Sequence, residues 1–402
     1  MIAFVTNLCT PMATIIKNQG EISNVLAQIG NYGNFIAYLV MGIPAGMLIA
    51  KYGYKKTALI GLLVGITGIL IQWYSGQLDA QANLGLVFGV YLVGALITGL
   101  CMCILNCVVN PMLNLLGGGG NKGNQLIQIG GVFNSSAAVA CYILMGALIA
   151  DASKAKIADA TPALMIALAI FVIAFVIILF TKIEEPEQAP VQLDLIKGAM
   201  SYKHFALGTL GIFLYMGIEV GVPNFVQQYL IEERNIPAAT VGMLVAVYWF
   251  MMLIGRFVGA SIGDKVSSRA MITTVSCATM VLVLFGMFAP TDVLVSFPGV
   301  DWGKLEMIWQ PVPVGIFSFL LVGLCTSVMW GAIFNMAVEG LGKYTAIASG
   351  IFMTMVFGCA VMMFIQATVA DMTDYITSFW VVVFCAAYLL YYAQVGSKIA
   401  KK

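Results

Sequence analysis

Charged side chains are nearly absent from the long apolar stretches of this 402-residue chain. Only two of them, Glu219 and Arg256, lie within those stretches. Charged residues make up 9 % of the sequence and hydrophobic residues 61 %, whereas a soluble domain carries about 25 % charge. Because such a chain cannot cover a surface that faces water, the sequence predicts an integral membrane protein.

Apolar runs of about 20 residues, the length that a helix needs to cross the hydrocarbon core, recur about twelve times. They begin near Met1, Ser23, Thr57, Leu84, Gln125 and Pro162, and then near His204, Ala238, Ala270, Val314, Ala346 and Ile376. The polar segment 182–203 separates six runs from six. We therefore expect an all-α membrane fold with a bundle of six helices at 1–181, a cytoplasmic linker at 182–203 and a second bundle at 204–402.

Lys and Arg are distributed unequally between alternate loops. If the N-terminus is inside, most of the 19 basic residues fall in cytoplasmic segments, as the positive-inside rule requires. We expect a multi-pass protein of the cell inner membrane with both termini cytoplasmic. The basic residues are scattered over short loops, so we expect no nucleic-acid partner. We also expect a monomer.

Cysteine residues offer no clear site for chemistry. All nine fall in apolar spans, where cysteine behaves as a small hydrophobe. Cys101, Cys103 and Cys107 share one helix, but the only histidine of the chain is His204, so packing is favoured over a soft-metal site. Without a clustered nucleophile, base or metal set, the sequence predicts neither an enzyme nor a bound cofactor.

The two halves repeat each other. The loop sequence GMLIAKYGYKK from Gly46 aligns with ASIGDKVSSRA from Ala260, which places Lys55 over Arg269. NPMLNLLG from Asn110 likewise aligns with NMAVEGLG from Asn335. The second half has a longer outer insert, 290–313. Duplicated bundles of this kind build a midplane site in one large class of secondary transporters.

Loop and helix motifs together resemble the major facilitator superfamily. Asp264, Lys265 and Arg269 match its loop signature, although Ala50 stands where the first copy would carry an acid. An ordered set of motifs is similar to the fucose/galactose/glucose cation symporter family. These motifs are MGIPAG (41–46), NP followed by LG (110–117), FNS (133–135), GIEVG (217–221), GR (255–256) and GLGKYT (340–345).

Two acids of that family are missing from this chain. The resemblance places Thr10 and Asn106 at their positions, and neither side chain can titrate. Glu219 is then the one membrane carboxylate that could take up a proton or ligate a sodium ion. An intramembrane acid usually serves an ion or substrate path. The alternative is a structural Glu219, hydrogen-bonded to a neighbouring helix or paired with Arg256.

The resemblance implies a sugar substrate, and a sugar site should use neutral amides and hydroxyls, because these groups bond to vicinal hydroxyl groups. The resemblance adds that the first, fourth, seventh and tenth helices line the cavity. The candidates are Asn7, Thr10, Asn106, Asn110, Asn134, Asn224, Gln227 and Asn335. Tyr38, Tyr248, Trp249 and Trp330 are candidate stacking faces. For each polar residue alone, a hydrogen bond between helices is an equal alternative.

Arg256 lies near the cytoplasmic end of its span. With Asp264, Lys265 and Arg269 it predicts a gating or structural ion network. The chain as a whole is interpreted as a secondary transporter that imports a monosaccharide, such as fucose, galactose or glucose, with H⁺ or Na⁺. Cation-independent facilitation and efflux are the alternatives within the superfamily. A membrane enzyme or a sugar sensor is the alternative from another class.

Overall fold

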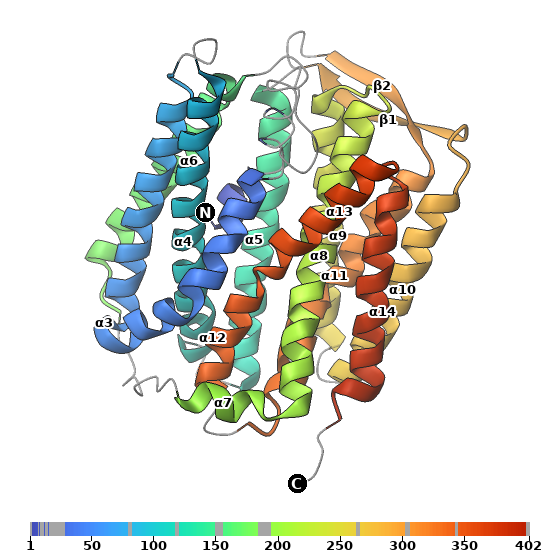
Figure 1. Ribbon diagram of the computed structural model, residues 1–402. Helices are drawn as coiled ribbons and strands as arrows, with labels where there is room; N and C mark the ends of the chain where they lie inside the picture. Colours follow the sequence, from blue (N-terminus) through green and yellow to red (C-terminus); the bar gives the residue numbers. More distant parts are fainter. Residues whose placement is uncertain are drawn as a thin grey trace.

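The computed structural model describes residues 2–6, 8, 12, 15, 29–78, 83–116, 120–148, 156–183, 194–262, 266–301, 306–341 and 345–398. Within these ranges, nine helices are long and apolar enough to cross a membrane, and shorter apolar helices lie at Gly33–Ile49 and Ile129–Met145. The helices stand side by side with their axes roughly aligned (Figure 1). The predicted all-α membrane fold is confirmed.

Long helices account for the first half of the described chain. They are α3 (Ile29–Ser75), α4 (Leu84–Leu116), α5 (Gly120–Leu148) and α6 (Thr161–Phe180), the last preceded by a 3-10 turn, η1 (Ile157–Ala160). α3 contains two spans, because its backbone departs from helical geometry at Gly53, where φ is 80°. A side chain would be strained at this positive φ. Glycine therefore allows the chain to turn back into the membrane.

The rest of the described chain begins with a short helix in the predicted linker and contains the one described sheet. Its helices are α7 (Asp194–Met200), α8 (Lys203–Glu232), α9 (Ala238–Ile262), α10 (Ser268–Phe288), α11 (Gly315–Val338), α12 (Thr345–Met355), α13 (Gly358–Met372) and α14 (Trp380–Tyr391), with short turns η3 (Thr377–Phe379) and η4 (Tyr392–Gly396). The outer insert forms an antiparallel hairpin of β1 (Leu294–Asp301) and β2 (Glu306–Pro313), a strand pair that the sequence did not predict.

The two ends of the molecule carry different elements. α7 and the C-terminal end lie at one end, and the hairpin β1–β2 lies at the other (Figure 1). We call these ends the linker side and the hairpin side. Since α9 runs from the hairpin toward the start of α10, Arg256 lies in the part of α9 nearer the linker side.

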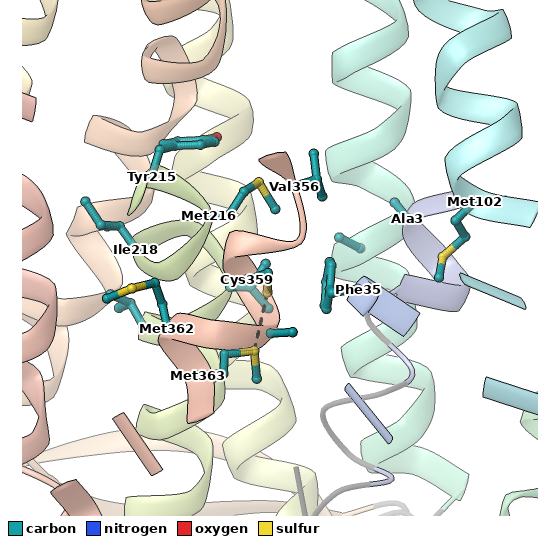
Figure 2. Close-up of a cluster of buried hydrophobic side chains, with 14 of the residues drawn as sticks. Ala3, Phe35, Met102, Tyr215, Met216, Ile218, Val356, Cys359, Met362 and Met363 are labelled. Carbon is teal, nitrogen blue, oxygen red and sulfur yellow. Dashed lines mark hydrogen bonds between the residues drawn. The ribbon is translucent and has the colours of Figure 1, made fainter. Parts of the chain in front are cut away.

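Helices from the two halves meet at several places. α5 packs against α9, α3 packs against α12 and α13, and α4 makes a smaller contact with α12. Figure 2 shows part of the buried core, to which Tyr215, Met216 and Ile218 of α8 and Met362 and Met363 of α13 contribute. These contacts join residues far apart in the sequence and place α8 and α9 next to the interface between the halves.

Candidate functional site

The GIEVG motif lies in the middle of α8 and explains how the helix packs. A Cβ at Gly217 would lie 2.6 Å from the Met362 side chain, and one at Gly221 would lie 2.9 Å from Gln366 Oε1. The two glycines are one turn apart and therefore share a face, which α13 approaches closely. Glu219 is two residues from each, so it points to the opposite side of α8, where it is half-buried.

Glu219 has polar partners on its own helix and on α9. Its side chain is hydrogen-bonded to the Tyr215 hydroxyl one turn earlier, and the Arg256 guanidinium attracts it electrostatically. Glu219 is thus held by a donor on α8 and by a cation from α9.

Pro223 creates a further polar contact at the same position. Proline has no N–H, so the carbonyl of the residue four positions earlier, Glu219, lacks its helical donor. The Tyr248 hydroxyl of α9 donates to this carbonyl over 3.0 Å. The sequence contains a signal for this contact. A proline four residues after Glu219 leaves the Glu219 backbone carbonyl without a helical donor, so another group is needed to bond to it.

α11 completes this polar group. Tyr248 Oη lies 3.2 Å from Thr326 Oγ1, and Tyr215 Oη lies 3.4 Å from the Thr326 carbonyl oxygen. We call Tyr215, Glu219, Tyr248, Arg256 and Thr326 the Glu219 network. It joins α8, α9 and α11, and two of its members, Tyr215 and Thr326, were not predicted.

Aromatic rings border the Glu219 network. The ring of Tyr248 lies edge-on to that of Trp249, with centroids 5.3 Å apart, and the rings of Tyr215 and Trp330 are 6.2 Å apart. Trp330 is half-buried, whereas Tyr248 and Trp249 are buried. Of the stacking candidates on these helices, Trp330 therefore offers the most accessible face.

Arg256 reaches across to the other half of the chain. Its Nη1 donates to the Ser135 hydroxyl over 2.8 Å and to the Gly131 carbonyl, both on α5. The preceding Gly255 lies against α11, where a Cβ would be 2.2 Å from Ser327 Oγ. The GR motif therefore combines a close helix contact with a cation that bonds to the opposite bundle.

The predicted ion network had three further members: Asp264, Lys265 and Arg269. Asp264 and Lys265 lie outside the described residues. Arg269 is described, and its Nη2 donates to Ser397 Oγ over 3.5 Å, which places it at the end of the chain's last helical turn. Arg256 and Arg269 thus bond to separate parts of the molecule.

A buried group of amides lies on α8 between the Glu219 network and the hairpin side. Asn224, Gln227 and Gln228 are each at most 5 % exposed. Gln228 Nε2 donates to Asn224 Oδ1 over 3.3 Å. Among the described residues, Asn224 Nδ2, Gln227 Oε1 and Gln228 Oε1 have no hydrogen-bond partner. Because an unpaired buried polar atom is costly, these atoms suit a polar ligand.

The first half contributes two hydrogen-bonded pairs between α3 and α4. Asn106 Nδ2 donates to the Tyr38 hydroxyl over 2.8 Å, and the Thr98 hydroxyl donates to Asn34 Oδ1 over 2.9 Å. Asn106 is a predicted sugar contact and Tyr38 a candidate stacking face, and the structure places them in contact with each other. The buried Asn34–Thr98 pair was not predicted.

The remaining predicted sugar contacts have different positions. Asn7 and Thr10 lie outside the described residues, and Asn110 belongs to α4 but its side chain is not described. Asn134 on α5 and Asn335 on α11 are exposed. Within the residues searched, no group of three or more His, Cys, Asp and Glu side chains could hold a metal ion.

Comparison with protein families decides the class of this helical bundle. A model of the Major Facilitator Superfamily matches residues 1–364. The chain belongs to this superfamily. The resemblance noted in the sequence is therefore confirmed at the level of the superfamily.

Individual relatives cover nearly the whole chain. The chain is 27 % identical over 99 % of its length to a glucose/galactose transporter of Brucella abortus, of which 92 % is covered. It is 20 % identical over 94 % of its length to an L-fucose-proton symporter of Escherichia coli, of which 86 % is covered. Among solved structures it is similar to the transporter FucP in the outward conformation, with a TM-score of 0.68, 18 % identity and coverage of 99 % of this chain and 98 % of FucP.

Proposed function

We propose that this member of the superfamily imports a monosaccharide, such as glucose, galactose or fucose, together with a cation. The relatives named above carry such sugars. The observation that carries the proposal is the half-buried Glu219 on α8, held by Tyr215 and Arg256 and followed on the same helix by amides with unpaired atoms. Such a helix supplies a cation-binding group and sugar-binding groups together.

The proposed transporter alternates access between two bundles, 1–181 and 204–402, joined by a linker at 182–203. It lies in the inner membrane with the linker side and both termini in the cytoplasm. It works as a monomer without a cofactor and has no nucleic-acid partner. The hairpin β1–β2 then faces the outside.

Sugar recognition is assigned to neutral polar side chains of both bundles. On α8, the unpaired atoms of Asn224 and Gln227 support this role, because a sugar hydroxyl both donates and accepts hydrogen bonds. Asn106 and its partner Tyr38 offer an equivalent polar pair on the other bundle. The set also includes Asn7, Thr10, Asn110, Asn134 and Asn335. Trp330 offers a ring face for the apolar side of the sugar.

Transport proceeds in three steps in this proposal. Glu219 takes up H⁺ or Na⁺ from the outside, which neutralises its charge. The sugar then binds to the amides and completes the contacts between the bundles. The loaded transporter opens on the linker side, where it releases both substrates. Because the carboxylate carries the cation, its loss should uncouple sugar movement from the gradient.

Uptake of labelled monosaccharides into proteoliposomes tests this function. A pH gradient and a sodium gradient are imposed separately, and Glu219→Gln is compared with the unmodified protein. We expect accumulation above equilibrium under one gradient, and only exchange or equilibration in Glu219→Gln. Unchanged accumulation in Glu219→Gln would contradict the role of Glu219.

A cation-independent facilitator is the second candidate. It is favoured by Thr10 and Asn106, which stand where the resembling family carries acids, and Asn106 is engaged with Tyr38. Equilibration of sugar at the same rate with and without either gradient would support the facilitator. Glu219 would then have a structural role.

A further inference from the structure

Arg256 is placed between two bundles that must separate during transport. Its guanidinium belongs to α9 of the second half and donates to the Ser135 hydroxyl of α5 in the first half over 2.8 Å. It also donates to the Gly131 carbonyl. Ser135 is 1 % exposed and Arg256 is half-buried, so the bond is partly shielded from water.

The fit at this contact is close. A Cβ at Gly131 would lie 3.3 Å from Arg256 Nη1 and 3.4 Å from its Cδ, which is tighter than an ordinary van der Waals contact. Glycine at this position therefore lets the guanidinium approach the backbone of α5. The FNS and GR motifs, far apart in the sequence, meet here through Ser135 and Arg256.

The same guanidinium is attracted by Glu219 within its own bundle. A cation at membrane depth is costly without compensation. In this conformation Arg256 has two kinds of compensation: the carboxylate of Glu219, and the two acceptors of α5. When α5 and α9 separate, Arg256 loses its bonds to Ser135 and to the Gly131 carbonyl, and only the Glu219 carboxylate remains beside it. The free energy needed to open the contact therefore depends on the charge of Glu219.

We propose that Arg256 is a latch between α5 and α9 whose strength is set by the charge of Glu219. When Glu219 is ionised, Arg256 keeps a counter-charge after the contact opens. When Glu219 is neutral, Arg256 depends on Ser135 and Gly131, and the closed contact is favoured. The proposal rests on the assignment of Glu219 as the cation-binding group.

The latch has a consequence for coupling. A transporter that has taken up its cation but no sugar carries a neutral Glu219, so its linker side stays closed and the cation does not leak. The contacts made by a bound sugar then have to provide the free energy that opens the latch. Arg256 is in this sense a positioning residue, which acts on transport without contacting the sugar.

No other charged group among the described residues faces Glu219. The titratable and charged groups packed against it are Tyr215 on its own helix and Tyr248 and Arg256 on α9. From α11, the neighbouring groups are the neutral Thr326 and Trp330. Arg256 is therefore the charged side chain that this part of the described chain places against Glu219.

The distance between α5 and α9 on the linker side measures the state of the latch. Spin labels on Ile129→Cys and Ser261→Cys, both exposed positions, report this distance by double electron–electron resonance in nanodiscs. Cys277→Ser serves as the background, because Cys277 is exposed and the other described cysteines are buried. Each variant is first shown to be monodisperse and helical.

Ser135→Ala tests the latch without changing any charge. We expect a shift toward longer distances, with a roughly tenfold larger open fraction, the size expected for a lost hydrogen bond to a charged group. Ser136→Ala is the matched control, because Ser136 is exposed and bonds only to the Val132 carbonyl of its own helix. Arg269→Gln is a second control, since it removes an arginine that bonds to Ser397.

The charge of Glu219 is tested by Glu219→Gln. We expect this variant to shift the distribution toward the short distance, and Arg256→Gln to shift it toward the long one. The double variant should show the same long distances as Arg256→Gln alone, because without Arg256 the charge of Glu219 no longer affects the contact between α5 and α9. Distances that are the same in Ser135→Ala, Arg256→Gln and the unmodified protein would overturn the latch.

The direction of the Glu219→Gln shift separates this inference from the proposed function. A shift toward the long distance would overturn the dependence on Glu219. If the distances shift as expected but the purified protein transports no sugar, the proposed latch is supported and the proposed function is rejected. Both results come from the same purified protein.

Discussion

At the scale of single residues, a substitution of Gln227 distinguishes a role in sugar binding from a role in packing, because the amide oxygen of Gln227 is unpaired among the described residues. Gln227→Met keeps the shape of the side chain and removes its polar atoms. Because Gln227 Oε1 has no partner among the described residues, we expect the melting temperature to stay the same or rise. We expect sugar affinity to fall about 5-fold to 100-fold, the cost of one to two lost hydrogen bonds.

Gln366→Met is the matched control for this prediction. Gln366 is equally buried, but its Nε2 donates to Ser378 Oγ over 3.3 Å. Its replacement should lower the melting temperature and leave sugar affinity nearly unchanged. Isothermal titration with sugar and thermal unfolding in detergent measure both quantities. A stability loss without an affinity loss in Gln227→Met would make Gln227 a packing residue.

The partner of Arg256 shows why part of the site could not be predicted. The shortage of charge in the spans was enough to single out Glu219 and Arg256. The bond from Arg256 to the Gly131 carbonyl has no signal in the sequence, because every residue carries a backbone carbonyl. Asn134 was a sugar candidate by residue type alone, and its exposure depends on how α5 is rotated.

Glu233 predicts a dependence of stability on pH. It follows the last residue of the α8 span, and partial burial raises the pKa of its carboxyl group, an effect that Asp374 and Glu232 reinforce and that the Tyr375 N–H and Arg234 oppose. With the folded pKa above the unfolded one, the folded state binds more protons between the two values. Stability therefore falls as the pH rises through this window.

The measurement for Glu233 is the melting temperature in detergent between pH 4 and pH 7. Glu233→Gln should remove a small part of the decline with pH, since the side chain is largely exposed and its interactions are screened. Glu306→Gln, which removes an exposed carboxylate on β2, is the control for the loss of one negative charge. A steeper decline in Glu233→Gln would contradict the prediction.

At the scale of elements, glycines set how closely the helices pack. On α11, a Cβ at Gly323 would lie 2.2 Å from the Tyr248 carbonyl, whereas one at Gly331 would meet nothing within 4 Å. We expect Gly323→Ala to lower the stability by about 1–3 kcal/mol through overpacking. Gly331→Ala should be neutral or stabilising by up to about 1 kcal/mol, because alanine favours a helix. Thermal unfolding of both variants measures the difference.

Gly323→Ala should also disturb transport, since Tyr248 bonds to the Glu219 carbonyl. Equal melting temperatures for the two alanine variants would show that α9 and α11 are not in contact at Gly323. The same two proteins therefore test the packing and its link to the site.

The starts of most spans could be predicted, but the breaks between elements could not. The run predicted from Ala238 begins at that residue in α9, and the run predicted from His204 begins one residue earlier in α8. Hydropathy alone determines these positions. The break between α12 and α13 has no such signal, and Gly358 at the start of α13 lies directly against α8, where a Cβ would be 2.2 Å from the Phe213 carbonyl. The hairpin β1–β2 depends on pairing across a turn, and Pro298 and Gly299 in β1 are typical of a loop.

At the scale of the whole molecule, two basic residues make equivalent contacts in the two halves. Lys55 Nζ donates to the carbonyls of Leu179 and Thr181, at the end of α6. Arg269 donates to Ser397, beyond the end of α14. Each cation thus lies at the C-terminal end of the last helix of its half, where the helix dipole favours positive charge. Lys55 and Arg269, which align in the two sequence repeats, therefore occupy equivalent positions in the structure.

The orientation in the membrane follows from the same basic residues. Lys55 and Arg269 lie on the linker side, and the positive-inside rule places this side in the cytoplasm. Single cysteines at Lys197 on α7 and at Glu306 on β2, both exposed, should then react differently with a membrane-impermeant maleimide. In intact cells carrying the Cys277→Ser background, we expect Glu306→Cys to be labelled at once and Lys197→Cys only after permeabilisation. Labelling of Lys197→Cys alone in intact cells would reverse the orientation. It would also place the Arg256 contact between α5 and α9 toward the outer side. A neutral Glu219 would then keep the outer entrance closed, and the transporter would be suited to export instead of import.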